Sequence, residues 1–258
     1  MAEDLEGPPV ALVTGGAIRI GGAISRALAQ AGYRVWIHYH RSQAEAAALA
    51  GELGDACIGT VAADLADEAA RASLCARVVD PAGPAGGRLD LLVNNAASFE
   101  RGAFVGREDA DLRRVLEVNL VAPLSLTRGV ARALVAARGA VVNILDVAAF
   151  QAWRGYADHC TAKAGLAMAT RALAVELAPA VRVNGVAPGT VAWPADDPRF
   201  AEGAELRERI VRAIPLGRIG SPEDIAETVV FLARSRFITG QVVAVDGGRL
   251  AAGGPGGA

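Results

Sequence analysis

The sequence predicts a single α/β domain built on a doubly wound parallel sheet, and three observations support this. Apolar segments rich in β-branched residues alternate with helical segments along most of the chain. That alternation is typical of βαβ units, which join parallel strands through right-handed crossovers. A length of 258 residues suits one such domain, and 52% hydrophobic residues supply a large core. We expect a Rossmann-type domain with seven parallel strands at residues 9–250, between a flexible N-terminus at 1–8 and a flexible tail at 251–258.

The expected strands are the short apolar segments, and the longer segments between them are the expected helices. The strands lie at residues 10–16, 33–40, 57–64, 89–96, 140–145, 181–189 and 241–248. The helices lie at residues 20–32, 42–54, 67–79, 108–137, 155–178 and 221–233. Ser42 and Ser221 are expected N-caps, Pro222 follows in the first turn, and Pro123 should bend or break its helix. A polar, helical insert at residues 195–212 is either a substrate lid or a plain surface excursion.

Composition excludes several classes of partner. The net charge is −2, so the chain has no basic surface of the kind that binds nucleic acid or membranes. The N-terminus is acidic and lacks a signal-peptide pattern, and no apolar run approaches the ~20 residues that span a bilayer. The three cysteines show no metal-binding spacing. We expect a reduced, cytoplasmic protein that acts on a small molecule, without metal, nucleic acid or membrane.

The first strand runs directly into a glycine-rich turn, Thr14–Gly21, which a helix follows. In a doubly wound sheet this turn binds a pyrophosphate, because glycines let the backbone approach and the helix N-terminus offers free N–H groups. We therefore expect a dinucleotide cofactor here, with Gly15, Arg19, Ile20 and Gly21 among its contacts.

The end of the second strand selects the nucleotide. An acidic residue there binds a ribose 2′-hydroxyl, whereas a basic residue accepts a 2′-phosphate. This strand ends in His38-Tyr39-His40-Arg41-Ser42, without a carboxylate. The guanidinium of Arg41 can bind a phosphate through two hydrogen bonds, and Ser42 and His40 lie beside it. The sequence thus predicts NADPH rather than NADH.

With these features, the chain resembles the short-chain dehydrogenase/reductase family over nearly its whole length. The matching motifs, in chain order, are the turn at 14–21, Asp64-Leu65, Asn94-Asn95-Ala96, Asn119, Lys163, Pro188-Gly189 and Asp246-Gly247-Gly248. The resemblance implies cofactor contacts from Asp64, Leu65, Asn95, Ala96, Lys163, Pro188 and Gly189. It also implies a homotetramer, which the apolar segment 241–248 suits.

Four details are similar to the pteridine reductase branch of this family. They are the segment 38–42, Arg19 in the glycine-rich turn, Phe99, and Asp146 where most members have a catalytic serine. The likeness implies reduction of a dihydropterin or a similar flat heterocycle, stacked by Phe99. The substrate contacts it implies are Arg19, Phe99, Asp146, Tyr156 and His159. A carbonyl reductase acting on another ketone is the alternative among enzymes.

The catalytic motif departs from the family. Lys163 is the only lysine among 26 basic residues, and His159 lies four residues before it, so both share one helix face. Family members have a tyrosine at that position; it protonates the substrate while the lysine lowers its pKa and holds the nicotinamide ribose. The family's Asn, here Asn119, supports a water that relays protons. Histidine in place of tyrosine puts this mechanism in doubt.

Three interpretations of His159 stay open. An imidazole titrates near neutral pH, so His159 can replace the tyrosine as the acid, with Asp146 as its partner. Alternatively, His159 is a bystander, and Asp146 or a bound water supplies the proton. The third interpretation is a catalytically impaired, NADPH-binding protein. We favour an active enzyme because Asn119, Asp146 and Lys163 are all present, and Tyr156 is either a substrate contact or a packed aromatic residue.

Overall fold

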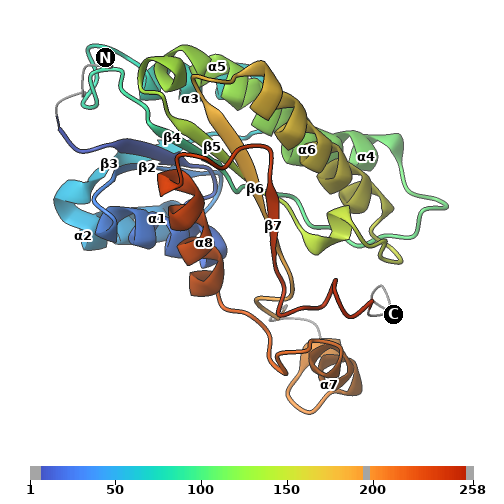
Figure 1. Ribbon diagram of the computed structural model, residues 1–258. Coiled ribbons are helices and arrows are strands. Elements are labelled where there is room, and N and C mark those ends of the chain that lie inside the picture. The colour runs from blue at the N-terminus through green and yellow to red at the C-terminus, as the bar shows by residue number, and fades with distance from the viewer. Residues whose placement is uncertain (1–6, 194–197, 254–258) are drawn as a thin grey trace.

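A sheet of seven parallel strands forms the centre of the protein (Figure 1). The computed structural model describes residues 7–193 and 198–253. The strands are β1 (Val10–Val13), β2 (Arg34–Tyr39), β3 (Cys57–Ala62), β4 (Leu91–Asn94), β5 (Ala140–Ile144), β6 (Arg182–Pro188) and β7 (Val242–Val245). Their order in the sheet is β3-β2-β1-β4-β5-β6-β7, so the winding direction reverses between β1 and β4. Ligands of such sheets bind at this reversal, beyond the carboxyl ends of the strands. The predicted fold class is confirmed.

Helices cover both faces of the sheet (Figure 1). One face carries α1 (Arg19–Gln30), α2 (Gln43–Leu53) and α8 (Pro222–Arg234), and the other carries α3 (Glu68–Val78), α4 (Asp109–Leu116), α5 (Ala122–Ala136) and α6 (Ala157–Glu176). Every residue of β1, β4 and β5 is buried as a result. This is why these strands are continuous apolar runs rather than alternating ones.

The two predicted N-caps differ in the structure. Ser221 forms a capping box: its hydroxyl accepts from the Asp224 N–H at 3.2 Å, and the Asp224 carboxylate accepts from the Ser221 N–H at 2.7 Å. Pro222 begins α8, as predicted. Ser42 does precede α2, but its side chain makes no capping hydrogen bond within the described residues. Its backbone, at φ −84° and ψ 56°, lacks the extended conformation of a cap, so that part of the prediction is wrong.

The expected break near Pro123 is a π-helical turn. The turn spans Glu117–Val121 between α4 and α5, and the Ala122 N–H donates to the Glu117 carbonyl, five residues back. Proline has no N–H and its ring clashes with the carbonyl four residues earlier, here that of Asn119. The wider turn accommodates this clash. Asn119 is fully buried on the turn.

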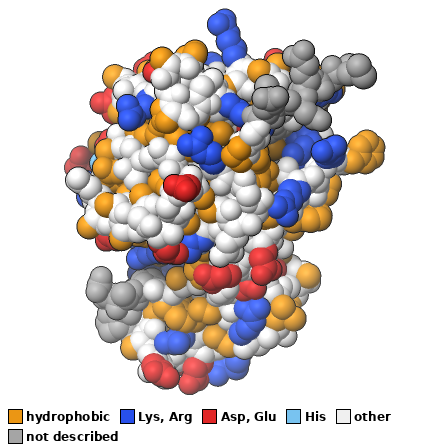
Figure 2. All heavy atoms as spheres, turned by 90° about the vertical axis from the view of Figure 1, so that its left-hand side faces the viewer, with side chains coloured by type: hydrophobic (Ala, Val, Ile, Leu, Met, Phe, Trp, Pro, Cys, Tyr) orange, Lys and Arg blue, Asp and Glu red, His pale blue; other side chains and the backbone are white. Residues whose placement is uncertain are grey.

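The segment after β6 extends away from the body of the domain. It contains a short 3-10 turn at Pro198–Phe200 and α7 (Glu205–Arg212), which has no buried residue. α7 lies beyond the edge of the helix layers in Figure 1, and the same level of Figure 2 is a separate lower lobe. Residues 194–197, which include the start of the expected insert, lie outside the described part of the chain, as do residues 1–6 and 254–258 of the expected flexible ends. No helix in residues 7–193 and 198–253 is long and apolar enough to cross a bilayer.

Candidate functional site

A cavity of about 990 Å³ opens at the carboxyl ends of the strands. It is lined by the loops after all seven strands and by residues of the segment that carries α7. All but one of the predicted site residues line it: Gly15, Arg19, Ile20, Gly21, His40, Arg41, Ser42, Asp64, Leu65, Asn95, Ala96, Phe99, Asp146, Tyr156, His159, Lys163, Pro188 and Gly189. The exception is Asn119, which lies behind the wall and contacts His159.

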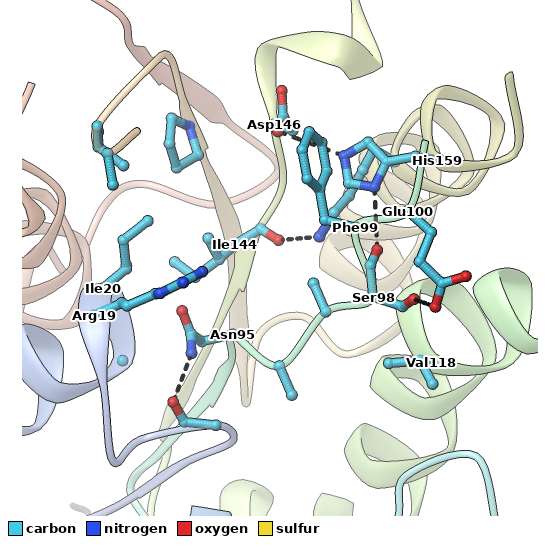
Figure 3. A pocket seen from close by; sticks show the side chains of 18 of the residues that line it. Arg19, Ile20, Asn95, Ser98, Phe99, Glu100, Val118, Ile144, Asp146 and His159 are labelled. Atoms are coloured by element: carbon cyan, nitrogen blue, oxygen red, sulfur yellow. Dashed lines mark hydrogen bonds and ion pairs between the residues drawn. The ribbon is translucent and has the colours of Figure 1, made fainter. Parts of the chain in front are cut away.

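The glycine-rich turn leaves room for a ligand at the start of α1. Gly15 has φ +58°, and a Cβ there would crowd Ala96 and Asn95 at 3.2 Å, so glycine is favoured. A Cβ on Gly21 would overlap the Gly15 carbonyl oxygen, so glycine is required there. No side chain of the described residues caps α1, which leaves its first N–H groups open to the cavity. A pyrophosphate fits this arrangement. Arg19 has φ +50°, a conformation that glycine favours, and its side chain extends toward the middle of the cavity (Figure 3).

His38, which the sequence did not mark as a site residue, holds this turn in place. Its Nδ1 accepts from the Gly15 N–H at 3.0 Å, so its Nε2 carries the proton and donates to the Ala63 carbonyl at 3.0 Å. The ring is 1% exposed, and burial lowers its pKa from 6.5 to about 4. His38 is therefore neutral, and it connects the end of β2 to the turn after β1.

Basic side chains gather where β2 ends. Arg41 and His40 are exposed at the cavity rim, and Ser42 follows them. His40 Nε2 lies 3.7 Å and Arg114 Nη1 lies 3.9 Å from the Asp64 carboxylate. A backbone hydrogen bond from Ala66 lowers the pKa of Asp64, and the charges of His40, Arg114 and Arg41 lower it further. This corner thus combines several positive groups with one carboxylate from the end of β3.

The loop after β4 is fastened to the glycine-rich turn. The Thr14 hydroxyl accepts from the backbone N–H groups of Asn95 at 2.8 Å and Ala96 at 3.0 Å. The Asn95 side-chain amide donates to the Thr14 carbonyl at 2.8 Å and to the Gly15 carbonyl at 3.1 Å. These bonds fix the floor of the cavity between its two ends.

His159 lies between two acceptors at the far end of the cavity (Figure 3). Its Nδ1 is 3.4 Å from the Ser98 carbonyl oxygen, and its Nε2 is 3.4 Å from Asp146 Oδ2. The Asn119 amide nitrogen, 3.4 Å from Nδ1, donates to the same Ser98 carbonyl at 2.8 Å. The imidazole is 3% exposed, so these groups fix its orientation.

The number of protons on the His159 ring decides how many of its neighbouring acceptors the ring can bind. A neutral ring has one N–H and can serve only one of the two acceptors, Ser98 or Asp146, whereas a ring with both protons serves both. The Asp146 contact is close enough for an ion pair, yet Nε2 makes no hydrogen bond of good geometry within the described residues. Nε2 is itself buried beside Asp146, and the residue lines the cavity.

Lys163 lies one turn further along α6. Its ammonium donates to the Ile144 carbonyl at 2.8 Å, and its side chain is 3% exposed. Burial lowers the pKa of Lys163 to about 8, while the nearby Asp146 carboxylate opposes that shift. The lysine is thus charged at neutral pH and loses its charge as the pH rises above about 8.

Aromatic residues form the wall around His159. Phe99 stacks on Tyr156 with ring centres 4.7 Å apart and meets His159 edge-on at 4.8 Å. Tyr156 therefore both packs against Phe99 and lines the cavity. The sequence did not identify Trp153, which contacts Tyr156 at 6.1 Å, or Trp193, which stacks on Phe200 at 5.6 Å. The cavity thus has flat, apolar surfaces on more than one side.

Arg249 is another cavity residue that no sequence pattern marked. The Asp246 carboxylate accepts from the backbone N–H groups of Gly248 and Leu250, both at 2.8 Å, and these bonds turn the chain after β7. Arg249, within this turn, points back into the cavity wall, where its guanidinium lies 5.6 Å from the centre of the Trp153 ring. Only the tertiary structure brings this arginine to the site.

Comparisons with known proteins agree with this geometry. The family described as Enoyl-(Acyl carrier protein) reductase matches residues 16–249. Pteridine reductase 1 of Leishmania tarentolae is 36% identical, over 93% of this chain and 96% of the relative. A putative granaticin polyketide synthase ketoacyl reductase 2 of Streptomyces violaceoruber is 36% identical, over 96% and 98%. A 3-oxoacyl-(acyl-carrier-protein) reductase of Aquifex aeolicus is 36% identical, over 93% and 96%. The chain is an oxidoreductase and belongs to the short-chain dehydrogenase/reductase family.

Proposed function

We propose that this protein is an NADPH-dependent reductase of a dihydropterin or a similar flat heterocycle, and that His159 delivers the proton. The observation that carries the proposal is the buried imidazole between Asp146 and Ser98, beside Lys163 and the exposed face of Phe99. Bound NADPH would supply a hydride. The residues of this chain would bind and orient both molecules and provide the proton.

The nucleotide end supports NADPH. Arg41 and Ser42 lie just beyond β2, after His40, where a carboxylate would favour NADH. Arg19 reaches into the same cavity. The one carboxylate of this corner, Asp64, comes from β3 and already faces His40 and Arg114. We propose that Arg41 and Ser42 bind the 2′-phosphate and that Lys163 binds the nicotinamide ribose.

His159 suits the role of acid better than Asp146. The Asp146 carboxyl group lies 3.4 Å from His159, and its charge also acts on Lys163 and Arg249. The cations Lys163 and Arg249 lie near this carboxylate, and Nε2 of His159 faces its Oδ2, so we assign Asp146 as a partner of the imidazole. Asn119 and Ser98 are positioning residues, since they fix the ring through Nδ1 while Nε2 lies beside Asp146.

Reduction of a ketone is the second candidate function. Two of the relatives are described as a ketoacyl reductase and a 3-oxoacyl-(acyl-carrier-protein) reductase. The aromatic walls formed by Phe99, Tyr156, Trp153 and Trp193 favour a flat ring over a flexible acyl chain, because ring faces stack well on one another. Pteridine reductase 1, a third relative, has a name that agrees with the heterocycle.

A substrate panel tests the proposal. NADPH absorbance is followed with dihydropterins, β-ketoesters and simple ketones, and each active substrate is repeated with NADH. We expect turnover of a dihydropterin and a preference for NADPH. The substitution Arg41→Ala should weaken NADPH binding at least about tenfold with little effect on NADH, because a charge-assisted hydrogen bond is lost. Arg128→Ala, at an exposed position on α5 outside the cavity, is the matched control.

Each outcome of the panel decides between the candidates. Turnover of ketones alone would contradict the heterocycle as substrate and support the second candidate function, reduction of a ketone. Tight NADPH binding without turnover of any substrate would identify a binding protein instead. Equal or tighter binding of NADH would contradict the cofactor assignment. A homotetrameric assembly and a cytoplasmic location remain part of this proposal, and light scattering measures the first.

A further inference from the structure

Arg249 is a buried cation with few partners. Its side chain is 4% exposed, yet its one hydrogen bond within the described residues is a long one, 3.3 Å, from Nη1 to the Thr190 hydroxyl. Its Nε is buried without a hydrogen-bond partner, and no carboxylate of residues 7–193 or 198–253 forms an ion pair with it. One face of the guanidinium is covered by Trp153.

A buried cation with so few polar partners is costly for the fold. Burial lowers the pKa of Arg249, while the charges of Asp146 and Asp246 oppose that shift, but an arginine side chain stays charged in proteins. An uncompensated buried charge destabilises a fold, so buried arginines are normally paired. A ligand that brings a negative group into the cavity would satisfy this one.

The position of Arg249 assigns that ligand group to the substrate. Its neighbours are Trp153 and Thr190, and the charge of Asp146, the partner of His159, reaches it. The expected 2′-phosphate site, Arg41 and Ser42, belongs to the loop after β2, whereas these neighbours belong to the loops after β5 and β6. Arg249 thus belongs with the catalytic end of the cavity.

We propose that Arg249 is a specificity-determining residue that binds a carboxylate of the substrate. A planar carboxylate matches the two-pronged donor geometry of a guanidinium stacked on a ring. A doubly charged phosphate fits less well, because Asp146 and Asp246 already place negative charge nearby. The proposal rests on the proposed function in that it assigns the substrate to the same cavity. It adds that the substrate is acidic.

Two matched pairs of substrates test the proposal. The first is dihydropterin-6-carboxylate against 6-hydroxymethyldihydropterin, and the second is acetoacetate against methyl acetoacetate. In the pair that the wild type reduces, kcat/KM should be at least about tenfold higher for the acid. The substitution Arg249→Met keeps the apolar stem on Trp153 and should remove this preference, mainly through KM. Turnover of the neutral member should stay within about threefold.

Two further variants test whether the acid preference depends on the guanidinium group and on its position. Arg249→Lys keeps a charge but not the planar fork, so it should restore part of the preference. Arg154→Met removes the same charge from an exposed position on the cavity wall and should leave the preference intact. NADPH affinity, measured for every variant, reports whether the protein is folded and whether its nucleotide site is unchanged.

The outcomes separate this proposal from the proposed function. If only the ketone pair is reduced, the heterocycle is wrong, and the acid preference still decides the role of Arg249. If neither pair is reduced, calorimetry measures the affinities of the two pterins for the NADPH-saturated protein. The acid should then bind more tightly than the neutral pterin if Arg249 has the proposed role. An acid preference that is absent, or that survives Arg249→Met, overturns the proposal. A loss of NADPH affinity in Arg249→Met would assign the arginine to the cofactor and would overturn it as well.

Discussion

His38 and His159 are both buried imidazoles, and their neighbours give them opposite tasks. His38 has a donor, the Gly15 N–H, at one nitrogen and an acceptor, the Ala63 carbonyl, at the other. A neutral ring satisfies both, so this histidine is structural. His159 has the Asp146 carboxylate at Nε2, and at Nδ1 both an acceptor, the Ser98 carbonyl, and a donor, the Asn119 amide. Residue type alone does not distinguish these roles.

The environment of His38 predicts a loss of stability in acid. The unfolded state takes up a proton near pH 6.5, but the folded state does so only near pH 4, so the folded protein loses about 3 kcal/mol as the pH falls through this window. The substitution His38→Asn removes the titration and keeps an acceptor for the Gly15 N–H. Between about pH 7 and pH 4.5, its free energy of unfolding in urea should fall by about 2 kcal/mol less than that of the wild type.

A matched control is available on the same strand end. His40 is exposed two residues away, and His40→Asn should leave the acid dependence as it is in the wild type. If His38→Asn loses stability with falling pH as steeply as the wild type does, His38 is not the cause of the loss of stability in acid.

At the scale of elements, the β1–α1 turn combines strain with function. Arg19 begins α1 at φ +50°, where a side chain is strained by roughly 1 kcal/mol. Its guanidinium extends into the cavity, which explains why an arginine is useful at a position that suits glycine. The turn thus combines a strained backbone with a positive charge inside the cavity.

The substitution Arg19→Gly should separate these two effects. Relief of the strain should raise the free energy of unfolding by up to about 1 kcal/mol, while NADPH binding should weaken because a positive charge is lost. Arg138, at φ +48° after α5, is a matched control outside the cavity. Arg138→Gly should stabilise the protein similarly and leave NADPH binding unchanged. Unaltered NADPH binding in Arg19→Gly would remove the arginine from the site.

Other elements show what the sequence could and could not predict. Pro123 marked a break in the helical segment 108–137, because the chemistry of proline is local. The π-helical form of the break was not predictable, since it depends on how α4 and α5 pack. Ser221 fulfilled its predicted role because a capping box needs only neighbouring residues, whereas Ser42 follows a strand whose end fixes its backbone outside the capping conformation.

At the scale of the whole molecule, the sheet explains why distant motifs meet. Alternating strands and helices predicted the fold. Nearly all of the residues predicted from motifs at successive strand ends line the cavity, because parallel strands end at one edge. His38 and Arg249 escaped prediction, since their roles depend on contacts with the turn at Gly15 and with Trp153. Local patterns reveal residues that act at motif positions, and the folded chain reveals those that act through neighbours.

The most direct test of catalysis is the turnover rate of His159→Ala. It is measured with saturating NADPH and the best substrate of the panel. Loss of the imidazole leaves the reacting atom without its proton donor, so the rate should fall by roughly 10²–10⁴-fold. The control is Tyr156→Phe, which keeps the stacking on Phe99 but removes a phenol hydroxyl from the same wall. Its turnover rate should stay within a few-fold of the wild-type rate. A His159→Ala rate within a few-fold of the wild type would show instead that the proton comes from another group.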